Sequence, residues 1–75
     1  MNKRDVARFY KLMGEAICVQ RMHRGLSQEN LGRAIGLTRT SVTNIEAGRQ
    51  RILAHQVPMV AAALNCRIGD LIGNI

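Results

Sequence analysis

The run QENLGRAIGLTRTSVTNIEA, residues 28–47, constrains the fold of this chain more than any other stretch. Apolar residues recur in both of its halves at intervals of three and four positions, the spacing that places one buried stripe on a helix. We expect these stripes to consist of Leu31, Ala34 and Ile35 in the first half and of Val42, Ile45 and Ala47 in the second. The pattern predicts two short helices joined by a tight turn, a helix-turn-helix.

Three residues mark the ends of the two helices. Ser27 and Thr38 each precede an apolar stripe, and their hydroxyl oxygens can accept a hydrogen bond from a free backbone N–H of the first helical turn. Gly36 stands between the stripes and can end the first helix, because glycine adopts a positive φ angle without a side-chain clash. The helix-turn-helix should therefore occupy residues 27–47.

Length and composition favour a single all-α domain covering residues 1–75. A chain of this size buries only a modest core, and with Phe9 and Tyr10 as the only aromatic residues that core must be aliphatic. A single proline and few alternating β-branched residues favour a compact bundle of about five helices. The ranges expected to be helical are 2–22, 28–35, 38–47, 54–65 and 68–72. We expect a kink or break of the first helix at Gly14.

The net charge of +6, from 11 Lys and Arg against 5 Asp and Glu, favours a polyanionic partner. Nine of the basic residues are arginine, whose planar guanidinium can donate two hydrogen bonds to a phosphate or to the edge of a guanine. General solubility is the alternative explanation of the charge. The helix-turn-helix pattern decides in favour of nucleic acid.

No apolar run approaches the roughly 18–20 residues that span a bilayer. The first residues, MNKRDVARFYK, also lack the apolar segment of a signal peptide. We therefore expect a cytoplasmic protein without a membrane partner.

The spacing of the central run is similar to that of the phage repressor and Cro family of XRE-type regulators. With Gln28 as the first position, Gly36 falls at the ninth, Val42 at the fifteenth and Ile45 at the eighteenth. The resemblance extends over roughly residues 12–72 and implies a lambda-repressor-like DNA-binding domain. Gly32 departs from the alanine usual in the family, but it meets the same need for a small residue where the two helices approach each other.

The resemblance implies that residues 38–47 form the recognition helix, which reads base edges in the major groove of double-stranded DNA. With Val42 and Ile45 turned inward, the opposite face carries the predicted base contacts, Arg39, Thr40, Thr43 and Asn44. The chemistry agrees, because arginine can fork onto guanine, asparagine can fork onto adenine, and a threonine methyl can touch the thymine methyl. Thr43 could equally contact a phosphate.

Contacts with the DNA backbone are expected on either side of this helix. The predicted phosphate contacts are Gln28, Ser41, Arg49 and Arg51. Gln28 begins the helix whose N-terminus can meet a phosphate, and the two arginines lie in a basic loop whose place in the family is over the backbone. The alternative is an ordinary helix start at Gln28 and a solvated loop at residues 48–51.

One structural ion pair is implied by the resemblance. The family places an arginine four residues before the glycine that ends the first helix, and that arginine pairs with a glutamate after the recognition helix. The matching residues are Arg21 and Glu46. Two exposed and unpaired side chains are the alternative.

Both ends of the chain raise further expectations. Residues 2–11 would extend the domain at its N-terminus, and their basic residues would either touch DNA or form a solvated face. In the C-terminal helices of residues 54–75, Ile68, Ile72 and Ile75 have no obvious place in so small a core. We expect them to form a homodimer interface rather than to pack as a tail.

Enzyme activity finds no support in the sequence. Neither His23 nor His55 has a spaced nucleophile or carboxylate partner, and there is no glycine-rich phosphate loop. Cys18 and Cys66 show no metal-ligand spacing and are expected to be small buried thiols. We therefore expect no metal, cofactor or small-molecule ligand.

The predicted function is that of a sequence-specific transcriptional regulator, most simply a repressor that binds an inverted repeat as a homodimer. Stand-alone proteins of the family include controller proteins of restriction–modification systems and regulators of phages or plasmids. The alternative is an antitoxin-like module that neutralises a partner protein and can also bind DNA.

Overall fold

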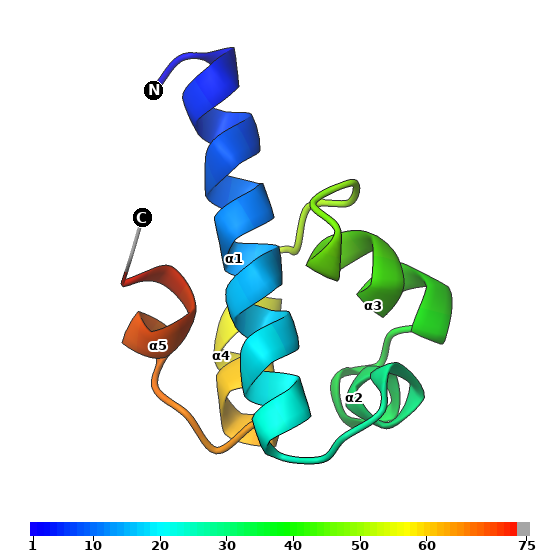
Figure 1. Cartoon of the computed structure of the whole chain (residues 1–75). Helices are drawn as coiled ribbons and strands as arrows, with labels where there is room; N and C mark the ends of the chain where they lie inside the picture. The colour runs from blue at the N-terminus through cyan, green and yellow to red at the C-terminus, as the bar shows by residue number, and fades with distance from the viewer. Residues whose placement is uncertain (74–75) are drawn as a thin grey trace.

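The structure, a computed structural model, describes residues 1–73 and contains five α-helices in that range, in agreement with the all-α prediction. Their bounds are α1 Lys3–His23, α2 Gln28–Ile35, α3 Arg39–Glu46, α4 Gln56–Ala63 and α5 Ile68–Ile72. The helices α2 and α3 lie on one side of α1, whereas α5 lies on the other side (Figure 1). Ile75, one of the predicted interface residues, falls outside the described residues.

The first helix is continuous through 21 residues, so the expected break at Gly14 is wrong. Gly14 serves a different purpose, because α1 crosses the end of α3 at this point. A Cβ atom on Gly14 would overlap the carbonyl oxygen of Ile45 and would lie 2.8 Å from that of Glu46. The glycine therefore allows the two backbones to approach, and the hydrogen bonds of α1 continue through it.

The predicted ends of the helix-turn-helix are confirmed. Ser27 accepts a hydrogen bond from the backbone N–H of Asn30 at 3.0 Å, and Thr38 accepts one from that of Ser41 at 3.1 Å. Gly36 ends α2 with a φ angle of 74°. A Cβ atom on Gly32 would lie 2.5 Å from the carbonyl oxygen of Leu37, so the turn packs directly onto α2.

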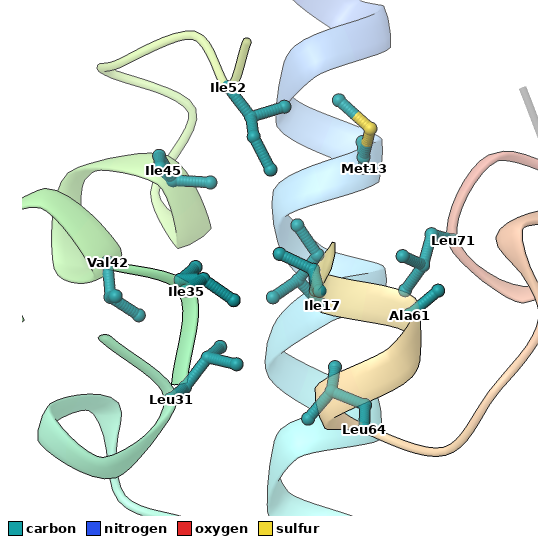
Figure 2. Close-up of a cluster of buried hydrophobic side chains, with 11 residues drawn as sticks. Met13, Ile17, Leu31, Ile35, Val42, Ile45, Ile52, Ala61, Leu64 and Leu71 are labelled. Atoms are coloured by element: carbon teal, nitrogen blue, oxygen red, sulfur yellow. The ribbon is translucent and has the colours of Figure 1, made fainter. Parts of the chain in front are cut away.

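The core is aliphatic, as expected. Its fully buried hydrophobic residues are Met13, Ile17, Leu31, Ile35, Val42, Ile45, Ile52, Val60, Ala61, Leu64 and Leu71. Ile17 of α1 lies at the centre, between the residues of the helix-turn-helix and those of α4 and α5 (Figure 2). Ala34 and Ala47 are exposed and do not belong to the buried stripes. Ala47 lies just after the last residue of α3.

Candidate nucleic-acid interface

The polar face of α3 points away from the core. Val42 and Ile45 are buried beneath the helix. Arg39 and Thr40 are exposed, and Thr43 and Asn44 are half-buried. The structure thus brings the four residues predicted to contact bases together on one side of one short helix, and the major groove of DNA admits an α-helix.

An ion pair fastens the end of α3 to α1. The Nε atom of Arg21 donates to Oε2 of Glu46 at 2.6 Å, and its Nη2 atom donates to Oε1 at 3.0 Å. The two side chains are only 13% and 6% exposed. Arg21 also donates to the carbonyl oxygen of Leu26 at 2.8 Å, which ties down the loop before α2.

The ion pair controls the protonation of Glu46. Burial alone would raise the pKa of this carboxyl group, but hydrogen bonds from Arg21 and Gln28 outweigh burial and hold its pKa below the ordinary value. The hydrogen bond to Glu46 in turn raises the pKa of Arg21. Both groups are therefore charged at neutral pH, and the pair acts as a fixed strut behind the recognition helix.

Gln28 links this strut to the polar face of α3. Its amide nitrogen donates to Oε1 of Glu46 at 3.0 Å, and its amide oxygen accepts the hydroxyl hydrogen bond of Thr43 at 2.7 Å. The sequence reasoning assigned Gln28 to a phosphate and did not foresee these partners. A primary amide carries two N–H groups, so one remains for a phosphate while the other holds Glu46.

Asn44 and Arg49 are joined by a hydrogen bond. The Nε atom of Arg49, in the loop after α3, donates to Oδ1 of Asn44 at 3.1 Å. A two-point contact with adenine needs both the oxygen and the nitrogen of the asparagine amide. The amide oxygen can accept two hydrogen bonds, so Arg49 can hold Asn44 in place while its other N–H groups remain available to the DNA backbone.

The two remaining predicted phosphate contacts lie at the start and just beyond the end of α3. Ser41 is half-buried in the first turn of the helix, where its backbone N–H is held by Thr38. Arg51 is exposed, and its guanidinium carbon lies 5.2 Å from the centre of the Tyr10 ring. Tyr10 played no part in the sequence-based site.

An open hollow of about 400 Å³ separates the start of α2 from the start of α3. Its lining consists of Arg21, Ser27, Gln28, Glu29 and Arg39. The free N–H groups at the start of α2 and the guanidinium of Arg39 favour an anion here. Glu29 does not cancel them fully, because its carboxylate pairs with Arg33 at 2.8 Å.

The predicted interface residues Ile68 and Ile72 belong to α5, on the side of α1 opposite the recognition helix (Figure 1). The two residues are 42% and 36% exposed. Leu53 and Met59 add further exposed apolar surface in the C-terminal part of the chain. The recognition helix and the candidate dimer face therefore do not compete for the same surface.

The cysteines are less buried than expected. Cys18 and Cys66 are free thiols, each half-buried, and burial raises the pKa of both above the ordinary thiol value. Cys18 accepts a weak hydrogen bond from Arg21 at 3.7 Å. Among residues 1–73 no three His, Cys, Asp or Glu side chains gather in a way that could hold a metal ion. No helix in that range has the length and apolar character needed to span a membrane.

Comparison with known proteins agrees with this geometry. Residues 20–71 match the family described as Helix-turn-helix. No curated protein sequence gave a significant match. The restriction-modification controller protein C.AhdI from Aeromonas hydrophila is 28% identical and superimposes with a TM-score of 0.83, over 89% of this chain and 97% of that one.

Two further solved structures share the arrangement. The hypothetical transcription factor NHTF from Neisseria is 31% identical, with a TM-score of 0.78 over 85% of this chain and 74% of that one. The P22 c2 repressor, solved with a synthetic operator, is 23% identical, with a TM-score of 0.77 over 85% of this chain and 97% of that one; at this identity it shows the fold alone.

These matches place the chain in the helix-turn-helix family, among the regulators of the phage-repressor and Cro (XRE) type. The protein is accordingly a DNA-binding transcriptional regulator. The family assignment confirms the sequence-based prediction.

Proposed function

We propose that this protein represses transcription by binding an inverted-repeat operator in double-stranded DNA as a homodimer. The observation that carries the proposal is the polar face of α3, which is exposed on one side and braced from behind by the Arg21–Glu46 pair. A rigid helix with an exposed polar face is what sequence reading in the major groove requires. Acting on DNA, the protein would work in the cytoplasm.

The base contacts follow from side-chain chemistry along α3. Arg39 lies in the first turn, is exposed, and can fork onto the O6 and N7 atoms of a guanine. Thr40 is exposed beside it and can present its methyl group to a thymine. Asn44 can read adenine through its amide oxygen and nitrogen, with Arg49 steadying the amide by its hydrogen bond to the oxygen. Thr43 is held by Gln28 and would contact a base or a phosphate from that fixed position.

The phosphate contacts would lie on either side of the base-contacting residues of α3. Gln28 can offer its second amide hydrogen, and Ser41 its hydroxyl group, on the side of α2. Arg49 and Arg51 would contact the backbone on the opposite side, in the loop after α3. These contacts fix the register of the helix in the groove without reading sequence.

Dimerisation would be mediated by α5. Ile68 and Ile72 are exposed apolar residues on a helix remote from α3, so pairing of two copies through this face leaves both recognition helices free. A symmetric pair of this kind reads two half-sites about 34 Å apart. The solved relative C.AhdI is described as a controller protein. The role that we propose here is control of the protein's own promoter or of a neighbouring one. An enzymatic role is not proposed.

Selection from a random pool of double-stranded DNA tests this function. An enriched inverted repeat would support a dimeric sequence reader. On that site Arg39→Ala and Asn44→Ala should each weaken binding by about 1–3 kcal/mol, with a smaller loss on random DNA. Arg24→Ala is the matched control, because Arg24 donates to the carbonyl oxygen of Asn65 at 2.9 Å and so points toward α4.

Two results would count against the proposal. Equal losses on selected and random DNA would make Arg39 and Asn44 phosphate contacts rather than base contacts. If no sequence is enriched from the pool, the protein has no specific operator. That result would favour the antitoxin-like alternative, in which a protein is the main partner.

A further inference from the structure

The third turn of α1, at Tyr10 and Lys11, contacts the basic loop that follows the recognition helix. This part of α1 lies before residue 20, where the match to the helix-turn-helix family begins. Figure 1 shows the loop after α3 lying beside the upper half of α1. A Cβ atom on Gly48 would lie 3.1 Å from the Cα atom and 3.2 Å from the Cβ atom of Lys11, so the backbone of the loop rests directly on the helix.

Arg51 is held at the far end of this loop. Its guanidinium carbon lies 5.2 Å from the centre of the Tyr10 ring, within the range of a cation–π contact. The next residue, Ile52, is buried in the core. The Phe9 ring meets the Tyr10 ring edge to face, with centroids 5.4 Å apart and planes at 78°. The Phe9 ring thus supports the Tyr10 ring from the side. Arg51 lies between Gly48, which rests on α1, and the buried residue Ile52.

The geometry leaves Arg51 able to bind an anion. A guanidinium that stacks on a ring uses its flat face, whereas its N–H donors lie in the plane of the group and point outward. Arg51 is exposed, so these donors can reach a partner. Ordering a long side chain on binding opposes association by about 0.5–1.5 kcal/mol, and a side chain already ordered on a ring avoids part of that loss.

We propose that Tyr10 is a positioning residue that holds Arg51 ready for a backbone phosphate, which makes the N-terminal part of α1 a component of the DNA-binding surface. Lys11, exposed beside Gly48, adds a second positive charge to the same edge. The partner of this edge is the DNA backbone next to the bases read by α3. The inference rests on the proposed function.

A double-mutant cycle on the selected operator tests the inference. Tyr10→Leu should weaken binding roughly 2- to 12-fold for each bound protein chain, because that range corresponds to the cost of ordering one long side chain. Tyr10→Phe keeps the ring and should bind like the wild type. In the Arg51→Ala background, Tyr10→Leu should have no further effect on affinity, because its only route to the DNA has been removed.

Salt dependence and a neighbouring variant separate positioning from general damage. Arg51→Ala should make the negative slope of log K against log salt concentration shallower by about 0.9 for each bound protein chain, the value for one phosphate contact. Tyr10→Leu should leave that slope unchanged, because it removes no charge. Phe9→Leu removes the ring that packs edge to face on Tyr10 but keeps the Tyr10 ring beneath Arg51. This variant should therefore weaken binding less than Tyr10→Leu does.

The inference is overturned if Tyr10→Leu weakens binding equally with and without Arg51, or if it leaves affinity unchanged. Should Tyr10→Leu unfold below the assay temperature, Tyr10→Met provides the same cycle, since methionine fills the space with a flexible apolar chain and no ring. Wild-type protein that selects no operator would refute the proposed function. A selected operator with no coupling between Tyr10 and Arg51 would refute only this inference.

Discussion

Removal of the Glu46 carboxylate should destabilise the domain far more than removal of an exposed carboxylate. Glu46 accepts three hydrogen bonds, two from Arg21 and one from Gln28. Glu46→Gln keeps the shape but replaces one acceptor oxygen with an N–H donor, which would face a donor of Arg21. The guanidinium would then be left in a site where its side chain is only 13% exposed.

The magnitude follows from this burial. Breaking a buried ion pair on one side costs about 3–5 kcal/mol, and the lower end applies because Arg21 retains its bond to the carbonyl oxygen of Leu26. We therefore expect Glu46→Gln to lose about 3 kcal/mol of the free energy of unfolding. For a domain of this size that loss lowers the Tm by roughly 12–24 °C.

The chain contains a matched control in the ion pair between Glu29 and Arg33. This pair has a similar N–O distance of 2.8 Å, but its side chains are 73% and 59% exposed for Arg33 and Glu29. Glu29→Gln should cost no more than about 0.5 kcal/mol. Thermal and urea unfolding, followed by circular dichroism, measure both variants. Equal small losses for Glu46→Gln and Glu29→Gln would refute the argument that burial makes the first pair a strut.

The carboxylate of Glu46, the close backbone approach at Gly14 and the exposed side chain of Ile72 can each be tested directly. The folded-state pKa of Glu46 lies below its unfolded value, so the stability that this carboxylate contributes is fully present above the unfolded pKa of about 4.3 and is lost as pH falls toward and through the lower folded pKa. Thermal melts from pH 7 to pH 3 should show this loss in the wild type. A Glu46→Gln variant with the same acid-dependent loss would contradict the prediction. Gly14→Ala should destabilise the domain by about 1–3 kcal/mol through overlap with the end of α3. Gly69→Ala, whose Cβ atom would meet no atom within 4 Å, should be neutral or should stabilise the domain by up to about 1 kcal/mol. Urea unfolding measures both variants, and similar free energies of unfolding would contradict the close approach at Gly14. Ile72→Asp should shift the protein from dimer to monomer in analytical ultracentrifugation, and an unchanged mass at all concentrations would place the dimer face elsewhere.

Local chemistry explains why the sequence was sufficient to predict the helix-turn-helix. Ser27, Gly36 and Thr38 determine where helices begin and end through hydrogen bonds that span three residues or through a single φ angle. The large apolar residues of the stripes have a helical spacing, so their inward direction follows once the helices are known. The same reasoning wrongly included Ala34 and Ala47, which are exposed. The orientation of the polar face of α3 follows from the same spacing.

The errors and omissions concern contacts between residues far apart in sequence. Gly14 predicts flexibility when only its neighbours are considered, but its role depends on the carbonyl groups of Ile45 and Glu46. Gln28 has suitable chemistry for a phosphate, yet its bonds to Glu46 and Thr43 depend on the packing of α2 against α3. No periodicity in the sequence indicates such pairs.

Tyr10 shows the same limit most clearly. Its partner Arg51 lies in a loop, where the backbone follows no repeating pattern, and the contact exists only because α1 passes beside that loop. An aromatic residue followed by lysine within a basic helix was the one available signal. It could equally indicate the edge of the core, where Tyr10 also packs.

The most direct test of the central claim is a competition titration at physiological salt between the selected operator and a shuffled duplex of the same length and composition. We expect the operator to bind at least about 10³-fold more tightly than the shuffled duplex, with two protein chains per duplex. Equal affinities for the two duplexes would contradict it, because the exposed face of α3 would then contribute charge and no sequence reading.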